Sequence, residues 1–301
     1  RAQRLVETRG PETCAPCGSS KASSLMCRFV LYLGEEITLS SLVTDPTNSI
    51  IRQSYDNQER VEPLNGDGFG VAWYAPHISD RPALFRAISP AWNNQNLLQL
   101  APVVQSSCVL AHVRAASPGL PVIQLNCHPF TFGRLAFMHN GDIPGFPRLR
   151  RRILNGLSER AFGAIQGSTD SEVMFHLALT FGLEDDPIPA LQRMAGEIER
   201  VAQGHDIEHP IQMTLGLTDG TRIYAVRYSS EGHSRSLFCS EHMDALKTLY
   251  PELEPFSSDA RAVVSEPIGD LVDTWLEIPE ASITVVEGGH LEAMPFEPRA
   301  A

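Results

Sequence analysis

The sequence predicts an α+β fold in which mostly antiparallel sheets carry helices on their outer faces. Two observations lead to this prediction. Strand-like segments fill the first half of the chain, two helical segments follow residue 141, and strands then return, without the strict strand–helix alternation of a parallel sheet. Two late strands, 213–217 and 222–228, flank the turn signal Asp219-Gly220, which is typical of an antiparallel hairpin.

The early strands are short and apolar. Residues 28–33 form the first expected strand, and the dense turn signal Asn65-Gly66-Asp67-Gly68 precedes the second. The segments expected next are a strand over 69–74, a loop over 76–82, a strand over 83–88, a strand over 109–113 ending at Arg114, and a strand over 134–139 ending at Asn140-Gly141. Polar candidates therefore stand where strands end, a common place for functional side chains.

A capping cluster and two apolar stripes indicate the helical segments. Ser168-Thr169-Asp170 suits a helix N-cap, with Glu172 in the first turn. The stripes are Val173, Met174, Leu177, Ala178 and Phe181, and then Leu191, Met194, Ile198 and Val201. After the hairpin, short strands are expected at 236–239, 262–265 and 282–286.

Composition narrows the class of protein. The 301 residues are 43% hydrophobic and 20% charged, as in ordinary globular proteins. A net charge of −12 disfavours nucleic acid and anionic membrane as partners. No apolar run approaches the roughly 18 residues of a membrane span. The six cysteines are irregularly spaced, so we expect a reducing cytoplasm rather than a disulfide framework. The lone pair Cys14-x-x-Cys17 lacks the second pair of a zinc site, and we expect neither metal nor cofactor.

The first 26 residues differ from the rest of the chain. They are rich in Arg, Ser, Pro and Gly and lack the apolar segment of a secretory signal peptide. They fit a disordered leader, a transit segment, a propeptide, or sequence upstream of the true start. We favour the last interpretation because Met26 directly precedes Cys27. One domain is then expected over residues 27–301.

Cys27, Asn140 and Gly141 predict acyl-transfer chemistry. Once Met26 is removed, the α-amino group of Cys27 is free to accept the thiol proton, which activates the sulfur as a nucleophile. Asn140 and Gly141 offer a side-chain amide and a backbone N–H, the two donors that an oxyanion needs. Taken singly, Cys27 also fits a buried apolar residue, and Asn140-Gly141 fits a type I′ hairpin turn.

Five short motifs follow one another along the chain. They are MCRF (residues 26–29), AHVRAAS (111–117), NCHPF (126–130), MHNGDI (138–143) and GSTDSE (167–172). Together they resemble the class II glutamine amidotransferase domain of the N-terminal nucleophile hydrolases. With NGDGFG (65–70), the likeness extends to a stand-alone subgroup. This subgroup contains the YafJ-like proteins, the ergothioneine-pathway γ-glutamyl amidohydrolases and the amidotransferase-like subunit of the fungal glutathione-degradation complex.

The resemblance implies a fold and a set of roles. The fold is an αββα sandwich of two antiparallel sheets flanked by helices. Cys27 is the implied nucleophile with its own amine as base, and Asn140 and Gly141 form the oxyanion hole. Arg114 holds the substrate α-carboxylate and Asp170 the α-amino group, which agrees with the chemistry of a guanidinium fork and an acceptor-only carboxylate.

Other residues keep two interpretations. His128 and His139 are further candidates for substrate binding. His112 and His128 each fit two interpretations, a residue that shapes the pocket or a structural histidine. Asn65–Gly70 fits pocket backbone or a plain tight turn. The basic run Arg148, Arg150, Arg151 and Arg152 fits a solvated helix face first and a docking patch second.

The expected function is cysteine-dependent hydrolysis of a γ-glutamyl amide through a thioester. The substrate is glutamine, glutathione or a γ-glutamyl thiol metabolite. The alternatives are a glutaminase subunit that supplies ammonia to a partner synthase, and a non-catalytic γ-glutamyl-binding scaffold. A partner subunit or a homo-oligomer remains open.

Overall fold

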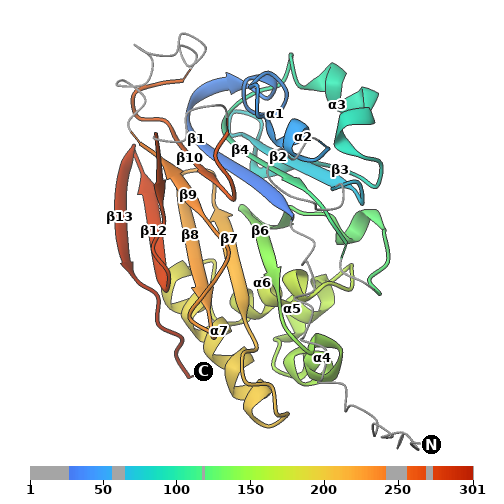
Figure 1. Ribbon diagram of the computed structural model, residues 1–301, viewed down its shortest axis with the longest axis vertical. Coiled ribbons are helices and arrows are strands. Elements are labelled where there is room, and N and C mark those ends of the chain that lie inside the picture. The colour runs from blue at the N-terminus through green and yellow to red at the C-terminus, as the bar shows by residue number, and fades with distance from the viewer. Residues whose placement is uncertain (1–26, 56–64, 117–118, 242–255, 269–273, 301) are drawn as a thin grey trace, which may run out of the picture.

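A computed structural model describes residues 27–55, 65–116, 119–241, 256–268 and 274–300. The expected leader, residues 1–26, lies outside the described residues. Within the described part, two antiparallel sheets face each other and helices cover the outer face of each (Figure 1). This arrangement confirms the expected αββα sandwich.

The first sheet has seven strands within the described residues. Their spatial order is β11 (Trp275–Glu277), β9 (Phe238–Ser240), β10 (Arg261–Val264), β1 (Arg28–Thr38), β4 (Gln105–Val113), β2 (Phe69–Ala75) and β3 (Ser79–Ala87). The short helices on its outer face are α1 (Ser40–Val43), α2 (Ile50–Gln53) and α3 (Gln95–Leu100).

The second sheet has six strands in the same part of the chain. Their order is β13 (His290–Pro295), β12 (Ser282–Glu287), β8 (Arg222–Ser229), β7 (Gln212–Thr218), β6 (Leu135–Asp142) and β5 (Phe130–Phe132). Its outer face carries the helices α4 (Phe146–Asn155), α5 (Glu159–Ala164), α6 (Asp170–Thr180) and α7 (Pro187–Gln203).

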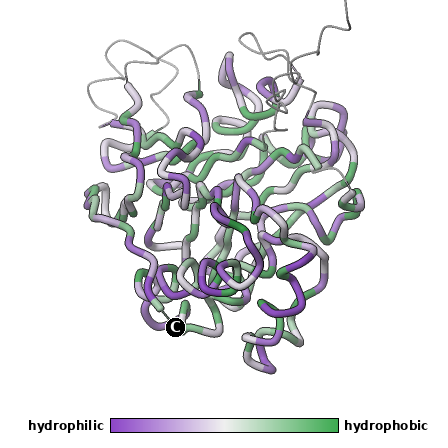
Figure 2. Tube along the Cα trace, turned by 60° about the horizontal axis from the view of Figure 1, so that its bottom comes forward, coloured by the Kyte–Doolittle hydropathy of each residue, from purple (hydrophilic) through white to green (hydrophobic). Residues whose placement is uncertain are grey.

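The alternation of side chains along each strand divides the core into three layers. Phe29, Leu110 and Met138 point into the space between the sheets. Their strand neighbours point outward: Val30 packs with α1–α3, while Phe137 stacks on Phe175 of α6 with ring centroids 5.1 Å apart. The strands at the centre of each sheet are therefore buried on both faces. Figure 2 shows this as hydrophobic colouring along the central strands and hydrophilic colouring along the periphery.

Three differences from the sequence-based prediction have physical causes. The strand expected at 83–88 begins at Ser79 and contains Pro82, which is tolerated because β3 is an edge strand and one side of it needs no ladder hydrogen bond. Asn140 and Gly141 lie inside β6, paired with Thr214 and Met213 of β7, so the hairpin-turn interpretation is wrong.

The third difference is the number of helices between β6 and β7. Two were expected, whereas α4 and α5 precede α6 and α7 in the described structure. Arg148, Arg151 and Arg152 are exposed on α4, whose buried face carries Phe146, Leu149 and Ile153. The solvated helix face is therefore the arrangement observed for this basic run.

Candidate active site

Side chains from both sheets meet at one end of the space between them. Cys27 directly precedes β1 and Arg114 directly follows β4, and the register pairs Arg28 with Val113, so the two candidates are neighbours across the strand pair. The Ala115 N–H donates to the Cys27 sulfur at 3.4 Å, and the thiol lies 3.6 Å from the Ala115 carbonyl oxygen. Partly buried Cys27 therefore lies against the residue that follows Arg114.

Asn140 reaches Cys27 from the opposite sheet. Its position on β6 has the same inward-facing parity as Met138, and its side chain is only 3% exposed. The Asn140 Nδ2 donates to the main-chain oxygen of Cys27 at 2.8 Å. An amide N–H₂ has two hydrogens, so this contact leaves one donor for another acceptor. The Thr214 hydroxyl donates to the Asn140 carbonyl at 3.0 Å and holds the backbone of β6 at this point.

Gly141 must be glycine because β6 and β7 approach each other closely here. A Cβ on Gly141 would lie 1.8 Å from the Gln212 carbonyl oxygen and 2.6 Å from His139 Nε2. No side chain fits at those distances. The glycine thus keeps the strand pair intact next to Asn140.

The segment Asn65–Gly70 supports the backbone around Arg114. The Arg114 N–H donates to the Gly68 carbonyl at 2.8 Å, the Asp67 N–H donates to the Arg114 carbonyl at 3.2 Å, and the Asp67 carboxylate accepts from the Ala116 N–H at 2.8 Å. Gly68 has φ +115°, and a Cβ there would lie 2.7 Å from the Cys127 sulfur. The turn therefore serves to position Arg114.

Arg114 is buried with part of its guanidinium unengaged. It is 4% exposed, and Nη2 is 3.5 Å from the Pro121 carbonyl oxygen. Nη1 has no hydrogen-bond partner within the described part of the chain. A buried donor without an acceptor is costly, so Nη1 is the guanidinium nitrogen that is available to a further acceptor.

Asp170 is linked to Arg114 through Asn126. The Asn126 amide donates to the Pro121 carbonyl at 3.0 Å and its oxygen accepts from the Ser168 N–H at 2.9 Å. Thr169 caps α6 by accepting from the Glu172 N–H at 3.1 Å, which makes Asp170 the first helical residue. Asp170 in turn accepts from the Ile143 N–H at 2.9 Å, just beyond β6. Three separate motifs are thereby brought to one end of the sandwich.

His112 and His128 form a buried neutral pair beside Arg114. Their rings stack with centroids 4.3 Å apart, and none of the four ring nitrogens has a partner among the described residues. Burial, followed by the charge of Arg114, lowers the pKa of His112 to about 3. Burial, followed by the neighbouring His112, puts the pKa of His128 well below its usual value. Both rings are therefore uncharged near neutral pH.

His139 faces away from the space between the sheets. Its Nδ1 is 2.9 Å from the Ser171 hydroxyl of α6, and its Nε2 is 3.3 Å from the Gln212 carbonyl oxygen of β7. Both ring nitrogens are engaged within the protein. The ring thus joins β6 to its helix layer and leaves no free polar atom for a ligand.

The environment of Cys27 combines burial with positive charge. Burial raises the pKa of its thiol, while the Ala115 N–H and then the guanidinium groups of Arg235, Arg114 and Arg28 act in the opposite direction. Cys108 and Cys239 are buried as well, and burial raises the thiol pKa of each to about 12. Of these three cysteines, Cys27 alone has three guanidinium groups acting on its thiol.

Arg235 is a residue at this site that the sequence did not indicate. It lies between β8 and β9, outside the five motifs, and its Nη1 donates to Asn140 Oδ1 at 2.8 Å. A single arginine in the loop segment Ser234-Arg235-Ser236 carries no periodicity or spacing that distinguishes it from a surface residue. Its proximity to Asn140 arises only from the fold.

Comparison with known proteins identifies the family of this chain. A family model described as class-II glutamine amidotransferases matches residues 41–298. The chain belongs to the class-II glutamine amidotransferases. A probable glutamine amidotransferase of Saccharomyces cerevisiae, DUG3, is 37% identical to this amidotransferase over 87% of the present chain and 82% of its own.

Two further relatives cover nearly the whole of this amidotransferase. The γ-glutamyl-hercynylcysteine sulfoxide hydrolase of Mycolicibacterium smegmatis is 27% identical over 90% of the present chain and 100% of its own. The solved structure of a glutamine aminotransferase class-II domain protein from Silicibacter pomeroyi is 29% identical, with a TM-score of 0.68 over 90% of this chain and 100% of that one. The protein is accordingly an enzyme of the amidohydrolase type.

The described residues show neither of two other kinds of feature. No group of three or more His, Cys, Asp and Glu side chains there gathers as metal ligands would. No described helix is both long and apolar enough to cross a membrane.

Proposed function

We propose that this amidotransferase hydrolyses the γ-glutamyl amide bond of a small molecule, with Cys27 as the nucleophile. The observation that carries the proposal is the meeting of Cys27 with Asn140 across the two sheets, at 2.8 Å between Asn140 Nδ2 and the Cys27 carbonyl oxygen. Acyl transfer requires a nucleophile and a hydrogen-bond donor for the oxyanion. Cys27 and the Asn140 amide are two such groups, and they lie close together.

The head of the substrate lies between Arg114 and Asp170. The unpartnered Nη1 of Arg114 supports an α-carboxylate there, since a guanidinium binds a carboxylate through two parallel hydrogen bonds. Asp170 Oδ1 accepts from both the N–H and the hydroxyl of Ser171, whereas Oδ2 accepts from the Ile143 N–H alone and keeps a second lone pair for an ammonium group. This pair selects a free α-amino acid head and directs the γ-carbonyl toward Cys27.

The reaction proceeds in two halves. The α-amine of Cys27 takes the thiol proton, the thiolate attacks the γ-carbonyl carbon, and the oxygen becomes an oxyanion facing Asn140 Nδ2 and the Gly141 N–H. Collapse of this tetrahedral intermediate breaks the C–N bond and leaves a γ-glutamyl thioester. The leaving amine takes the proton that the Cys27 α-amine had accepted. Water then attacks the thioester in the same way, releasing glutamate and restoring the thiol.

The relatives support a γ-glutamyl compound as the substrate class. The Mycolicibacterium smegmatis relative is named as a hydrolase of γ-glutamyl-hercynylcysteine sulfoxide. We therefore expect glutamine, glutathione and γ-glutamyl thiol conjugates to be the informative substrates.

The decisive experiment compares a chain that begins at Cys27 with one that keeps residues 1–26. Only the first has an α-amine on the nucleophilic residue. We expect glutamate release from the shorter form alone, and loss of that release in Cys27→Ala with an unchanged thermal melt. Cys239→Ala is the matched control, because Cys239 is buried on β9 and β9 pairs with β10 and β11.

A second measurement identifies the reacting atom. A diazoketone analogue of glutamine has an electrophilic carbon in place of the γ-amide and should label Cys27 while sparing Cys108, Cys127 and Cys239. Equal activity in the two forms, or a label on another cysteine, would contradict the proposed nucleophile.

A further inference from the structure

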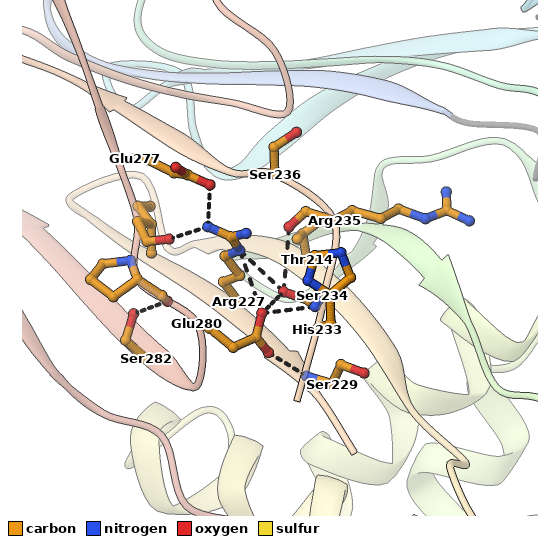
Figure 3. A network of polar contacts seen from close by, with 12 residues as sticks. Thr214, Arg227, Ser229, His233, Ser234, Arg235, Ser236, Glu277, Glu280 and Ser282 are labelled. Carbon is orange, nitrogen blue, oxygen red and sulfur yellow. Dashed lines mark hydrogen bonds and ion pairs between the residues drawn. The ribbon is translucent and has the colours of Figure 1, made fainter. Parts of the chain in front are cut away.

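Arg235 lies where a crossing segment passes over the end of the sandwich. The segment 230–237 leaves β8 of the six-stranded sheet and enters β9 of the seven-stranded sheet. The Arg235 side chain is 15% exposed, and it points away from the polar cluster that holds the segment (Figure 3). It ends at Asn140 on one side and at Asp142, 3.9 Å away, on the other.

The contact with Asn140 determines which way the amide faces. A guanidinium has only donors, so the atom 2.8 Å from Arg235 Nη1 must be the amide oxygen. The N–H₂ of Asn140 then faces Cys27, as the 2.8 Å contact to the Cys27 carbonyl shows. Without Arg235, only the Cys27 carbonyl would oppose rotation of the amide by half a turn, which would present an oxygen to a developing negative charge.

The segment that carries Arg235 is held on its other side by two charged side chains, buried Arg227 and partly buried Glu280. The Ser234 N–H donates to Glu280 at 2.8 Å, and the Ser229 N–H donates to the same carboxylate at 3.0 Å (Figure 3). Arg227 donates to the Ser234 hydroxyl at 3.1 Å and to the Ile278 carbonyl at 2.7 Å. β8 and the loop between β11 and β12 thus hold the residue before Arg235, which limits the positions that the Arg235 side chain can reach.

We propose that Arg235 is a positioning residue that holds the Asn140 amide with its N–H₂ toward the oxyanion of the γ-glutamyl substrate. This inference rests on the proposed function. A donor that is already oriented costs no reorganisation when the oxyanion forms, so the benefit appears in the transition state rather than in substrate binding.

Steady-state kinetics on the form that begins at Cys27 test the inference. Arg235→Met removes the donors and the charge at similar length, and we expect kcat to fall about 10- to 100-fold, less than the 10²- to 10³-fold typical of losing an oxyanion donor outright. KM should stay within about threefold. Arg235→Lys keeps a donor and a positive charge and should recover part of kcat. Arg222→Met, which breaks an exposed ion pair with Glu287, is the control and should retain wild-type kcat.

A double-mutant cycle with Asn140→Ala separates positioning from a general structural effect. If Arg235 acts through the Asn140 amide, Arg235→Met should lower kcat by less than about threefold once that amide is absent. Effects that multiply would show that Arg235 acts elsewhere and would overturn the inference while leaving hydrolysis intact. A wild-type enzyme with no turnover on any γ-glutamyl substrate would refute the proposed function, and with it this role of Arg235.

Discussion

We predict that the stacked pair of His112 and His128 lowers the stability of this protein in mild acid. Both rings are nearly fully buried, at 1% and 5% exposure, and both lie beside the fixed charge of Arg114. The pKa of His112 falls to about 3 and that of His128 lies well below its usual value, in each case chiefly through burial. The unfolded chain therefore binds protons at these positions over a pH range in which the folded chain does not.

The sign and size of the stability change follow from the linkage between proton binding and folding. Each folded-state pKa is depressed, so the stabilisation is present above the unfolded value of about 6.5 and is lost as the pH falls below it. For His112, with a folded-state pKa of about 3, integration from pH 7 to pH 5 gives a loss of about 2 kcal/mol, and His128 contributes in the same direction. Folded domains typically have a free energy of unfolding of only about 5–15 kcal/mol, so this loss is a large part of it.

Urea unfolding at pH 7 and pH 5 measures this loss. The wild-type free energy of unfolding should be lower at pH 5 than at pH 7. His112→Gln should reduce this difference by about 2 kcal/mol, and His128→Gln should reduce it as well, whatever the stability of each variant at pH 7. His77→Gln, at an exposed position, is the matched control and should leave the fall unchanged. An unaltered pH dependence in both buried variants would refute the reasoning.

Two further predictions concern packing and an inter-sheet hydrogen bond. Gly141→Ala should lower the free energy of unfolding by at least about 2 kcal/mol, because its Cβ would lie 1.8 Å from the Gln212 carbonyl oxygen. Gly163→Ala in α5 is the contrasting case. It should raise the free energy of unfolding by about 0.5–1 kcal/mol, because no atom lies within 4 Å of the position that its Cβ would take. Tyr74→Phe should cost about 1–3 kcal/mol in chemical denaturation, because its hydroxyl donates to the Arg134 and Thr218 carbonyls across the sheets. A neutral Tyr74→Phe variant or a stable Gly141→Ala variant would contradict these contacts.

Much of the candidate site could be predicted from the sequence, because short local patterns identify its residues. Short apolar runs bounded by turn signals predicted the strands, and polar residues at strand ends identified Arg114 and Asn140. The capping cluster 168–170 placed Asp170 within one residue of the observed start of α6, since a Ser/Thr/Asp cap is a local hydrogen-bonding arrangement. The resemblance added the roles, and the family is confirmed over residues 41–298.

Local patterns failed where a neighbouring strand decided the conformation. Asn140-Gly141 has the composition of a type I′ turn, but pairing with β7 draws both residues into β6. Pro82 indicates a loop, yet it lies in β3 because the edge of the sheet leaves it no ladder partner to satisfy. In both cases the strand context overrode the preference of the residues themselves.

The sequence by itself determined the fold class, the nucleophile candidate and the pair of groups suited to an amino acid head. Only the tertiary structure decided that Arg235 faces Asn140, that His112 stacks on His128, and that His139 belongs to the helix layer. These contacts join residues from separate elements, such as Asn140 and Arg235 at a separation of 95 positions. No periodicity within either element encodes them, because they depend on how the two sheets close on each other.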